Sequence, residues 1–174
     1  MAKDDPQGCC QHVTAGSSTT QTLFEMEFER GIWMAAIENN LPKLNEMIVK
    51  DKSCVNARDS SDYTALHYAA RAGFLEIMTA LLDNGANPNA QTASGKVTPL
   101  HRAAYMGHIE AIKLLTRYEA DPNLRDSDGK NALHKSCERN TKNAVECFHY
   151  LADNYPELRN AKDCKGRGCC KPAV

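Results

Sequence analysis

The segment Thr64-Ala65-Leu66-His67 returns twice in this chain, as Thr98-Pro99-Leu100-His101 and as Asn131-Ala132-Leu133-His134. The first two copies begin 34 residues apart, and the third begins 33 residues after the second. A pair of small residues follows each His, and these pairs are Ala69-Ala70, Ala103-Ala104 and Ser136-Cys137. Self-similarity at a period of about 33 residues is typical of a repeat solenoid, in which each repeat buries its apolar face against its neighbours.

The residues around these segments predict where short helices begin and end. Thr is a good helix N-cap, and Pro99 falls at the first helical position, where its missing N–H costs nothing. Gly73 and Gly107 follow where a short helix must stop, because glycine adopts the left-handed conformation cheaply. The pattern therefore predicts inner helices over 65–72 and 99–106 and outer helices over 75–83 and 109–117.

Composition narrows the class of protein. The chain has 174 residues, of which 42% are hydrophobic and 25% charged, and this suits one folded unit of ordinary size. Its formal net charge is −1, so a nucleic-acid partner is not expected. No apolar run reaches the ~20 residues that span a bilayer, and the polar N-terminus lacks the pattern of a secretory signal. We therefore expect no membrane partner, a cytoplasmic or nuclear location, and eight reduced cysteines.

The sequence pattern divides the chain into three parts. Residues 1–22 lack periodicity and predict a flexible N-terminal arm, residues 23–166 predict the repeat domain, and residues 167–174 predict a flexible tail. The expected repeats are 23–56, 57–89, 90–123 and 124–160, followed by a partial finger at 160–166. The first repeat departs from the pattern, as terminal repeats of solenoids do.

Two local departures from the repeat pattern lie in its turns. The finger of the third repeat is one residue longer than that of the second, because Asn89 to Thr98 spans 9 positions and Asn56 to Thr64 spans 8. Glu119 occupies the position that Gly85 fills one repeat earlier. If the backbone there is left-handed, a residue other than glycine costs on the order of 1 kcal/mol.

The end of the fourth repeat raises a separate question. Gly168-Cys169-Cys170-Lys171 lies where the repeated four-residue segment should return, and Pro172 follows, so no further helix is expected. The apolar side of the fourth repeat is then expected to be bare, to bind a partner, or to explain an oligomer. We expect a monomer, with self-association through this end as the alternative, and a truncated or alternative C-terminus is one interpretation.

The chain resembles the ankyrin-repeat family. The resemblance rests on Tyr63-Thr64-Ala65-Leu66-His67-Tyr68-Ala69-Ala70-Arg71-Ala72-Gly73 and on Val97 to His108, and it extends over roughly 24–166. It implies an all-α repeat solenoid of helix-turn-helix units with β-hairpin fingers, here four repeats and an incomplete fifth finger. It also implies a non-catalytic adaptor or scaffold that binds a protein partner through the concave face of finger tips and inner helices.

Transferring that face onto this sequence gives a set of candidate partner-binding residues. Tyr and Arg, which are enriched in binding hot spots, are prominent among them, and an acidic or phosphorylated peptide would suit the set. The competing interpretation is a solvated surface that is basic. The candidates are Tyr63, Tyr68, Arg71, Lys96, Arg102, Tyr105, Lys130, Lys135 and Arg139.

The histidines and cysteines admit a metal hypothesis, which the spacing disfavours. His67, His101 and His134 come one per repeat, too far apart to share one ion, so a core hydrogen-bonding role is expected and no metal is assigned. A zinc-stapled module would need the tail residues to meet, and these are Cys9, Cys10, His12, Cys164, Cys169 and Cys170. The remaining cysteines are interpreted as small packing residues, namely Cys54, Cys137 and Cys147.

Enzymatic function is not expected, and neither is a cofactor. Ser94-Gly95-Lys96-Val97-Thr98 is similar to the end of a phosphate loop, but Ala90 stands where the partner glycine is required. An alternative role is that of a substrate or decoy of an asparaginyl hydroxylase, because Asn89 and Asn123 each follow a Leu by eight residues, a pattern that the resemblance associates with such oxygenases. The competing interpretation is that both Asn side chains shape their turns.

Overall fold

The computed structural model describes residues 31–139 and 141–169, in which the helices come in successive pairs. A short inner helix is followed in each pair by an outer helix, and two 3-10 helices, η1 (Lys52–Asn56) and η2 (Pro156–Asn160), follow the first and last pairs. The pairs are α2 (Ile32–Ile37) with α3 (Leu41–Lys50), α4 (Ala65–Ala72) with α5 (Leu75–Asp83), α6 (Pro99–Met106) with α7 (Ile109–Arg117), and α8 (Ala132–Cys137) with α9 (Lys142–Asn154).

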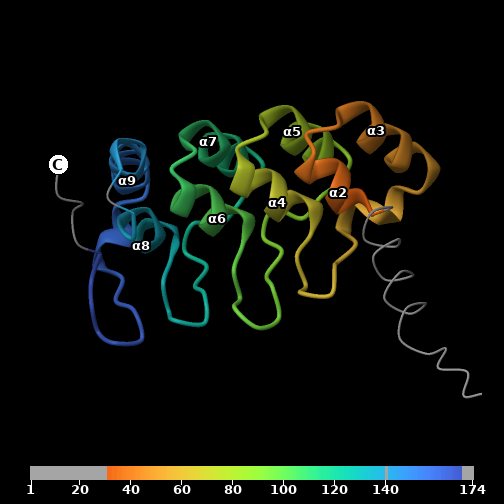
Figure 1. Ribbon diagram of the computed structural model, residues 1–174. Coiled ribbons are helices and arrows are strands. Elements are labelled where there is room, and N and C mark those ends of the chain that lie inside the picture. Colours follow the sequence, from red (N-terminus) through yellow and green to blue (C-terminus); the bar gives the residue numbers. More distant parts are fainter. Residues whose placement is uncertain (1–30, 140, 170–174) are drawn as a thin grey trace, which may run out of the picture.

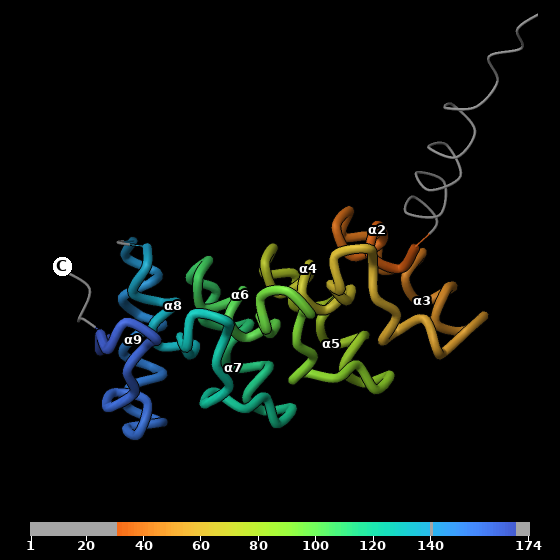
Figure 2. Tube along the Cα trace, turned by 90° about the horizontal axis from the view of Figure 1, so that it is seen from below, coloured from red at the N-terminus to blue at the C-terminus, as the bar shows by residue number. Residues whose placement is uncertain are grey.

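The pairs stand side by side in one row, with the connecting loops, here called fingers, projecting to one side (Figure 1). The inner helices pack in chain order, α2 on α4, α4 on α6 and α6 on α8, while α3, α5, α7 and α9 form a second layer behind them. Figure 2, turned by 90°, shows the same two rows from the side of the fingers. Each repeat therefore contacts only its neighbours, as in a solenoid.

The helix ends follow from the local sequence signals. Thr98 accepts a hydrogen bond from the backbone of His101 at 3.3 Å and begins α6, while Gly73 (φ 78°) and Gly107 (φ 83°) end α4 and α6 in the left-handed conformation. The predicted helices 65–72, 75–83, 99–106 and 109–117 are confirmed residue for residue. Glu119 has φ 63°, so the backbone there is left-handed and the cost considered for a residue other than glycine applies.

The core is a continuous apolar layer between the two rows of helices. Leu66, Leu100 and Leu133, each the second residue of an inner helix, are at most 1% exposed. The outer helices contribute fully buried side chains from the other side, among them Ile77, Ile112 and Leu151. Because helices this short are not stable alone, the burial between neighbouring repeats holds the fold together.

The fingers differ from the β-hairpins that the family resemblance implies. Within the described ranges they contain no regular strand, and their strand-like pairing is an isolated antiparallel bridge between Lys162 and Gly168. Each finger is instead held by hydrogen bonds at its base, such as those from the backbone of Asp59 to Tyr63 O and of Asp126 to Lys130 O, both 2.9 Å. The all-helical class stands, with the fingers as ordered loops.

Ordered contacts in the C-terminal part extend past residue 166, since Gly168 pairs with Lys162 and Cys169 is bonded to Cys137. The domain boundaries themselves stay a prediction. Of the three alternatives for the apolar side of the fourth repeat, a bare surface is contradicted at Leu133, Phe148 and Leu158, which are 0%, 5% and 1% exposed. The expected N-terminal arm, 1–22, and the first part of the repeat placed at 23–56 lie outside the described residues.

Among residues 31–139 and 141–169, none of the helices is both long enough and apolar enough to cross a bilayer.

Candidate functional site

The repeated His joins each inner helix to the finger of the next repeat. In His67, Nδ1 accepts a hydrogen bond from the backbone N–H of Thr64 at 3.2 Å, so the proton lies on Nε2, which donates to Val97 O at 3.0 Å. His101 does the same one repeat later, with Thr98 N at 3.1 Å and Lys130 O at 3.1 Å. Burial lowers the pKa of both rings to about 4, so both are neutral at pH 7.

His134 breaks this pattern because Asn131 replaces the capping Thr. Oδ1 of Asn131 accepts from the backbone of His134 at 3.0 Å and lies 2.6 Å from its Nδ1, which must therefore carry the proton. Nε2 is then bare, and it has no hydrogen-bond partner in the described part of the chain. Burial lowers the pKa of His134, partly offset by the nearby backbone of Arg167.

The fingers and inner helices bring an aromatic and basic cluster together at the second and third repeats. Arg102 donates to the hydroxyl of Tyr63, and its guanidinium carbon lies 5.1 Å from the centre of that ring. The rings of Tyr63 and Tyr68 lie 5.6 Å apart, and Tyr68 donates to Asp59 at 2.5 Å. Burial, helped by the Asp59 carboxylate, raises the pKa of Tyr68 well above its ordinary value. Nε of Arg102 is buried and has no partner in the described part of the chain.

The predicted basic residues of the fourth repeat are largely neutralised within the chain. Lys135 lies 2.7 Å from Asp126, whose exposed fraction is only 6%, and 3.5 Å from Glu138. Lys130 pairs with the same Glu138 and lies 3.8 Å from Asp128. Burial opposes ionisation of Asp126, but the hydrogen bonds from Lys135 and the Lys130 backbone outweigh it and lower the pKa of Asp126. Asp126 also shapes its turn, because its side chain accepts hydrogen bonds from the backbones of Asp128 at 2.9 Å and Lys130 at 2.8 Å.

A contact between Arg139 and Tyr105 extends the aromatic and basic cluster to the turn after α8. The guanidinium carbon of Arg139 lies 5.5 Å from the ring centre of Tyr105, and its Nη1 lies 3.3 Å from Sδ of Met106. Between this contact and Lys135 is a hollow of about 250 Å³. Its lining comes from α6, α8 and the adjoining turns, and consists of Val97, His101, Arg102, Tyr105, Lys135 and Glu138.

Two of the predicted residues stand apart from these contacts. Arg71 is exposed near the end of α4, and Lys96 is exposed at a finger tip with φ 48°. Neither side chain has an ion pair or hydrogen bond within the described residues. The structure therefore brings Tyr63, Tyr68, Arg102, Tyr105, Lys130, Lys135 and Arg139 onto one surface, here called the inner face, and leaves Arg71 and Lys96 at its margin.

The two Asn residues proposed as hydroxylation sites have different surroundings. Nδ2 of Asn89 donates to Glu119 O at 3.0 Å and its Oδ1 accepts from the backbone of Asp121 at 2.8 Å. Asn56 makes the equivalent pair of bonds one repeat earlier, to Gly85 O and from Asn87 N. The side chain of Asn123 makes no such bond within the described residues. Modification of Asn89 or Asn123 stays a prediction.

The expectation that all cysteines are reduced is wrong for one pair. Cys137 and Cys169 form a disulfide, so Cys137 is more than a packing residue. Cys54, Cys147 and Cys164 are free thiols, and burial raises the pKa of Cys147 to about 12. Within the described ranges no group of three or more His, Cys, Asp or Glu side chains could hold a metal ion. Part of the proposed zinc set, Cys9, Cys10, His12 and Cys170, lies outside those ranges.

Comparison with known proteins gives a consistent result. The family model described as "Ankyrin repeats (3 copies)" matches residues 7–92 and again residues 91–163. Ankyrin repeat domain-containing protein 39 from Homo sapiens is 45% identical over 84 residues, which are 48% of this chain and 45% of that protein. The protein of the same name from Bos taurus is 48% identical over 65 residues, 37% of this chain and 35% of that protein.

A second group of relatives is more distant. Ankyrin repeat domain-containing protein 49 from Drosophila melanogaster is 40% identical over 64 residues, 37% of this chain and 30% of that protein. The chain thus spans less than half the length of these curated relatives. The matches support the repeat architecture, while the activity and partners of the whole relatives are not carried over with it.

Proposed function

This chain belongs to the ankyrin-repeat family, and from that premise we propose that it is a non-catalytic adaptor or scaffold that binds a protein partner on its inner face. Repeats of this family generally mediate protein–protein interaction. We count four repeats and a fifth finger, and we propose that the protein acts as a monomer in the cytoplasm or nucleus. No cofactor is part of the proposal.

The observation that carries the proposal is the row of aromatic and guanidinium groups along the inner face. Tyr63, Arg102, Tyr105 and Arg139 come from three successive repeats and meet in two stacked pairs. The hollow of about 250 Å³ lies beside them. Rigid aromatic rings and planar guanidinium groups are the side chains that most often dominate binding energy, because they bury much area at a low cost in conformational entropy.

The charges of the inner face favour a partner segment that carries carboxylate or phosphate groups. Lys130 and Lys135 already have acidic partners, whereas Nε of Arg102 has none and Arg71 and Lys96 lack ion pairs within the described residues. Among the described residues, the guanidinium of Arg102 donates to the neutral hydroxyl of Tyr63 and not to a carboxylate, and a planar guanidinium group binds carboxylate or phosphate in a directed geometry. We therefore place the anionic group of the partner near Arg102.

The test is affinity capture from cell lysate with the full chain, comparing the wild type with Arg102→Glu/Tyr105→Ala. The matched control is Arg117→Glu, an exposed charge reversal on the outer helix α7 that leaves the inner face unchanged. Circular dichroism establishes first that every variant is folded. We expect proteins that the wild type and the Arg117 variant retain and that the inner-face variant loses.

Truncating a central Arg or Tyr anchor typically costs about 2 kcal/mol, or roughly thirtyfold in affinity. A purified captured protein should therefore bind the inner-face variant at least that much more weakly. Equal capture by all three folded proteins would place binding elsewhere and overturn the proposal.

A further inference from the structure

The disulfide between Cys137 and Cys169 sits at a defined position of the repeat pattern. Cys137 is the sixth residue of α8, the position that Ala70 and Ala104 hold in α4 and α6. Cys169 follows the last finger where Ala132 and Pro99 begin the inner helices of earlier repeats. The two Cα atoms lie 6.8 Å apart at a sequence separation of 32 residues. The disulfide thus links two positions that are occupied by Ala or Pro in the preceding repeats.

The finger that carries Cys169 is ordered by contacts that do not involve sulfur. Asp163 accepts hydrogen bonds from the backbones of Lys165 at 2.8 Å and Arg167 at 2.9 Å, and it forms an ion pair with the Arg167 side chain at 2.8 Å. These bonds, led by that from the Arg167 backbone, lower the pKa of Asp163 to about 2.

The preceding finger anchors this finger from outside. The backbone of Cys164 donates to Asp128 O at 2.9 Å, and Arg125 donates to Lys162 O at 2.6 Å. A Cβ on Gly129 would come within 2.9 Å of the Cys164 nitrogen, so the two fingers meet where only glycine fits. These noncovalent contacts therefore help to position Cys169 beside α8.

The carbonyl oxygen of Leu133 is a polar neighbour for both sulfur atoms, whether they are oxidised or reduced. Each of the two Sγ atoms lies 3.2 Å from the carbonyl oxygen of Leu133. After reduction either S–H group can donate to that oxygen, so the thiol pair is not left without a polar contact. Reversible oxidation is easier at a pair whose two states are both accommodated than at one that must unfold to be reduced.

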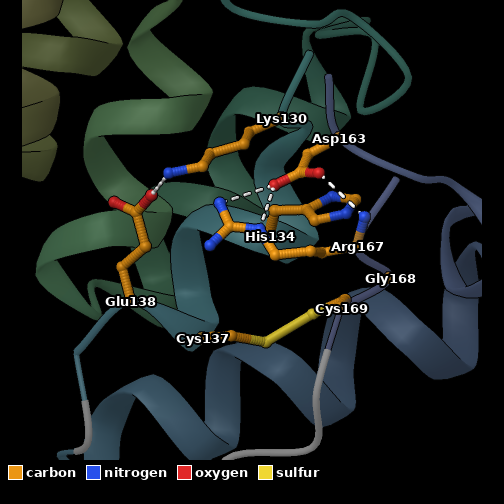
Figure 3. A pocket seen from close by; sticks show the side chains of 8 residues that line it. All are labelled: Lys130, His134, Cys137, Glu138, Asp163, Arg167, Gly168 and Cys169. Carbon is orange, nitrogen blue, oxygen red and sulfur yellow. Dashed lines mark hydrogen bonds and ion pairs between the residues drawn. A yellow bond between two sulfur atoms is a disulfide. The ribbon is translucent and has the colours of Figure 1, made fainter. Parts of the chain in front are cut away.

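Small redox reagents have a route to this pair. Cys137 and Cys169 are both partly exposed and line a hollow of about 240 Å³ together with Lys130, His134 and Arg167 (Figure 3). Cys169 also borders a second hollow of about 320 Å³, beside Leu133 and Phe148. The buried Cys147, by contrast, has a pKa raised by burial and no cysteine partner, and Cys164 is exposed but likewise unpaired within the described residues.

We propose that Cys137 and Cys169 form a redox modification site, whose reversible disulfide locks the finger over 160–169 onto α8. The oxidant is a peroxide such as hydrogen peroxide. One thiolate attacks a peroxide oxygen, giving a sulfenic acid and water, and the second thiolate displaces the hydroxyl as a second water while the S–S bond forms. Two thiols lose two electrons and two protons to one peroxide. In reverse, a dithiol such as dithiothreitol is oxidised to its disulfide while both cysteines regain protons.

In this proposal the disulfide controls whether the finger over 160–169 stays packed on α8. Cys169 separates the two hollows, and Leu133 beside it is fully buried. With the bond intact, Cys169 is covalently tethered to α8. With the bond reduced, the finger is held by noncovalent contacts, among them the bridge between Lys162 and Gly168, and local opening becomes accessible.

The first experiment maps the bond in the full-length chain by mass spectrometry after tryptic digestion without reduction. Oxidation with hydrogen peroxide should link the peptide 136–139, which contains Cys137, to the peptide 168–174, because trypsin does not cleave between Lys171 and Pro172. Since Cys169 and Cys170 share the second peptide, the Cys170→Ser variant should keep the link and the Cys169→Ser variant should lose it. No link in the oxidised protein, or its loss in Cys170→Ser, overturns the proposal.

The second experiment tests reversibility and the locking role. Equilibration in glutathione buffers of varied thiol-to-disulfide ratio should form and break the link reversibly without denaturant. Reduction should speed trypsin cleavage within 160–169 by about tenfold in the wild type and in the matched control Cys164→Ser, which lies on the same finger outside the pair. Cys137→Ser should be cleaved at the fast rate under both conditions. A link that resists glutathione until the protein unfolds, or a cleavage rate independent of redox state, overturns it.

Discussion

Arg102 of the third repeat donates a hydrogen bond to the hydroxyl of Tyr63 in the second and stacks 5.1 Å from the centre of the same ring. The contact bridges 39 residues of sequence and joins the residue before the Thr64 cap to the inner helix α6 of the next repeat. Because this contact orients the guanidinium group of Arg102 before any partner binds, the candidate surface is preorganised. Preorganisation of this kind reduces the entropy lost on binding.

The energetic link between these two residues can be measured by a double-mutant cycle. Tyr63→Leu and Arg102→Ala should show a coupling of about 0.5–1 kcal/mol in the free energy of unfolding, the range of a partly exposed cation–π pair. Urea unfolding of the wild type, both single variants and the double variant gives the value. As the control, Tyr63→Leu combined with Arg139→Ala should be additive, because Arg139 stacks on Tyr105 instead. Coupling of equal size in both cycles would contradict the assignment.

The buried histidines predict a loss of stability below pH 6.5. The folded pKa values of His67 and His101 are about 4, lowered by burial from 6.5, so the unfolded chain binds more protons between these values. The stabilisation is complete above pH 6.5 and is lost as the pH falls toward 4, by about 2 kcal/mol for each His at pH 5.

Chemical unfolding at pH 7 and pH 5 checks this window. Asp163, with a folded pKa of about 2, loses its own contribution only below the ordinary Asp range and does not interfere at pH 5. His67→Gln should show a smaller difference between the two pH values than the wild type. A free energy of unfolding that is unchanged from pH 7 to pH 5 would show that the rings do not titrate as buried neutral groups.

The turn at Glu119 is a candidate for stabilisation. Glu119 (φ 63°) and Gly85 (φ 86°) occupy the same position in successive repeats, and only the glycine is unstrained there. Glu119→Gly should raise the free energy of unfolding by about 0.5–1 kcal/mol, and Gly85→Ala should lower it by about 1 kcal/mol. Thermal unfolding of the two variants gives both signs. Destabilisation by Glu119→Gly would mean that its side chain contributes more than the backbone strain costs.

The two proposed hydroxylation sites should differ in their effect on stability. Asn89→Ala removes the bonds to Glu119 O and from Asp121 N and should cost about 1–2 kcal/mol. Asn123→Ala should stay within about 0.5 kcal/mol of the wild type, because its side chain has no equivalent bonds within the described residues. Urea unfolding of both variants decides the comparison. Intact mass after incubation with an asparaginyl hydroxylase tests modification separately, and an unchanged mass would remove that hypothesis.

The helices were predictable from sequence because their signals are local. The Thr cap, the Pro99 start and the glycine stop lie within a few residues of the helix ends they determine, so inner and outer helices could be placed to the residue in the second and third repeats. The burial and hydrogen bonding of His67 and His101 also followed from their repeated position after a cap.

The side-chain contacts between fingers and inner helices were not predictable in this way. The pairing of Lys135 with Asp126, and the disulfide between Cys137 and Cys169, depend on how closely a finger approaches α8. Nothing in the spacing of the cysteines indicates that distance. The sequence predicted which residues belong to the candidate surface. That Lys130 and Lys135 are neutralised by Glu138 and Asp126 became clear only from the three-dimensional structure.

The base of the third finger has a consequence for protein engineering. Val97 O accepts hydrogen bonds from His67 at 3.0 Å and from the backbone of Thr92 at 3.1 Å. The equivalent bond in the second finger runs from Asp59 to Tyr63, so the extra residue of the third finger lies between Thr92 and Val97 and leaves this bond intact. Chain added between Thr92 and Val97 therefore need not shift the helices on either side. A foreign loop grafted after Ser94 would be displayed from a rigid frame, which makes this tip a natural point for attaching an epitope or a reporter tag.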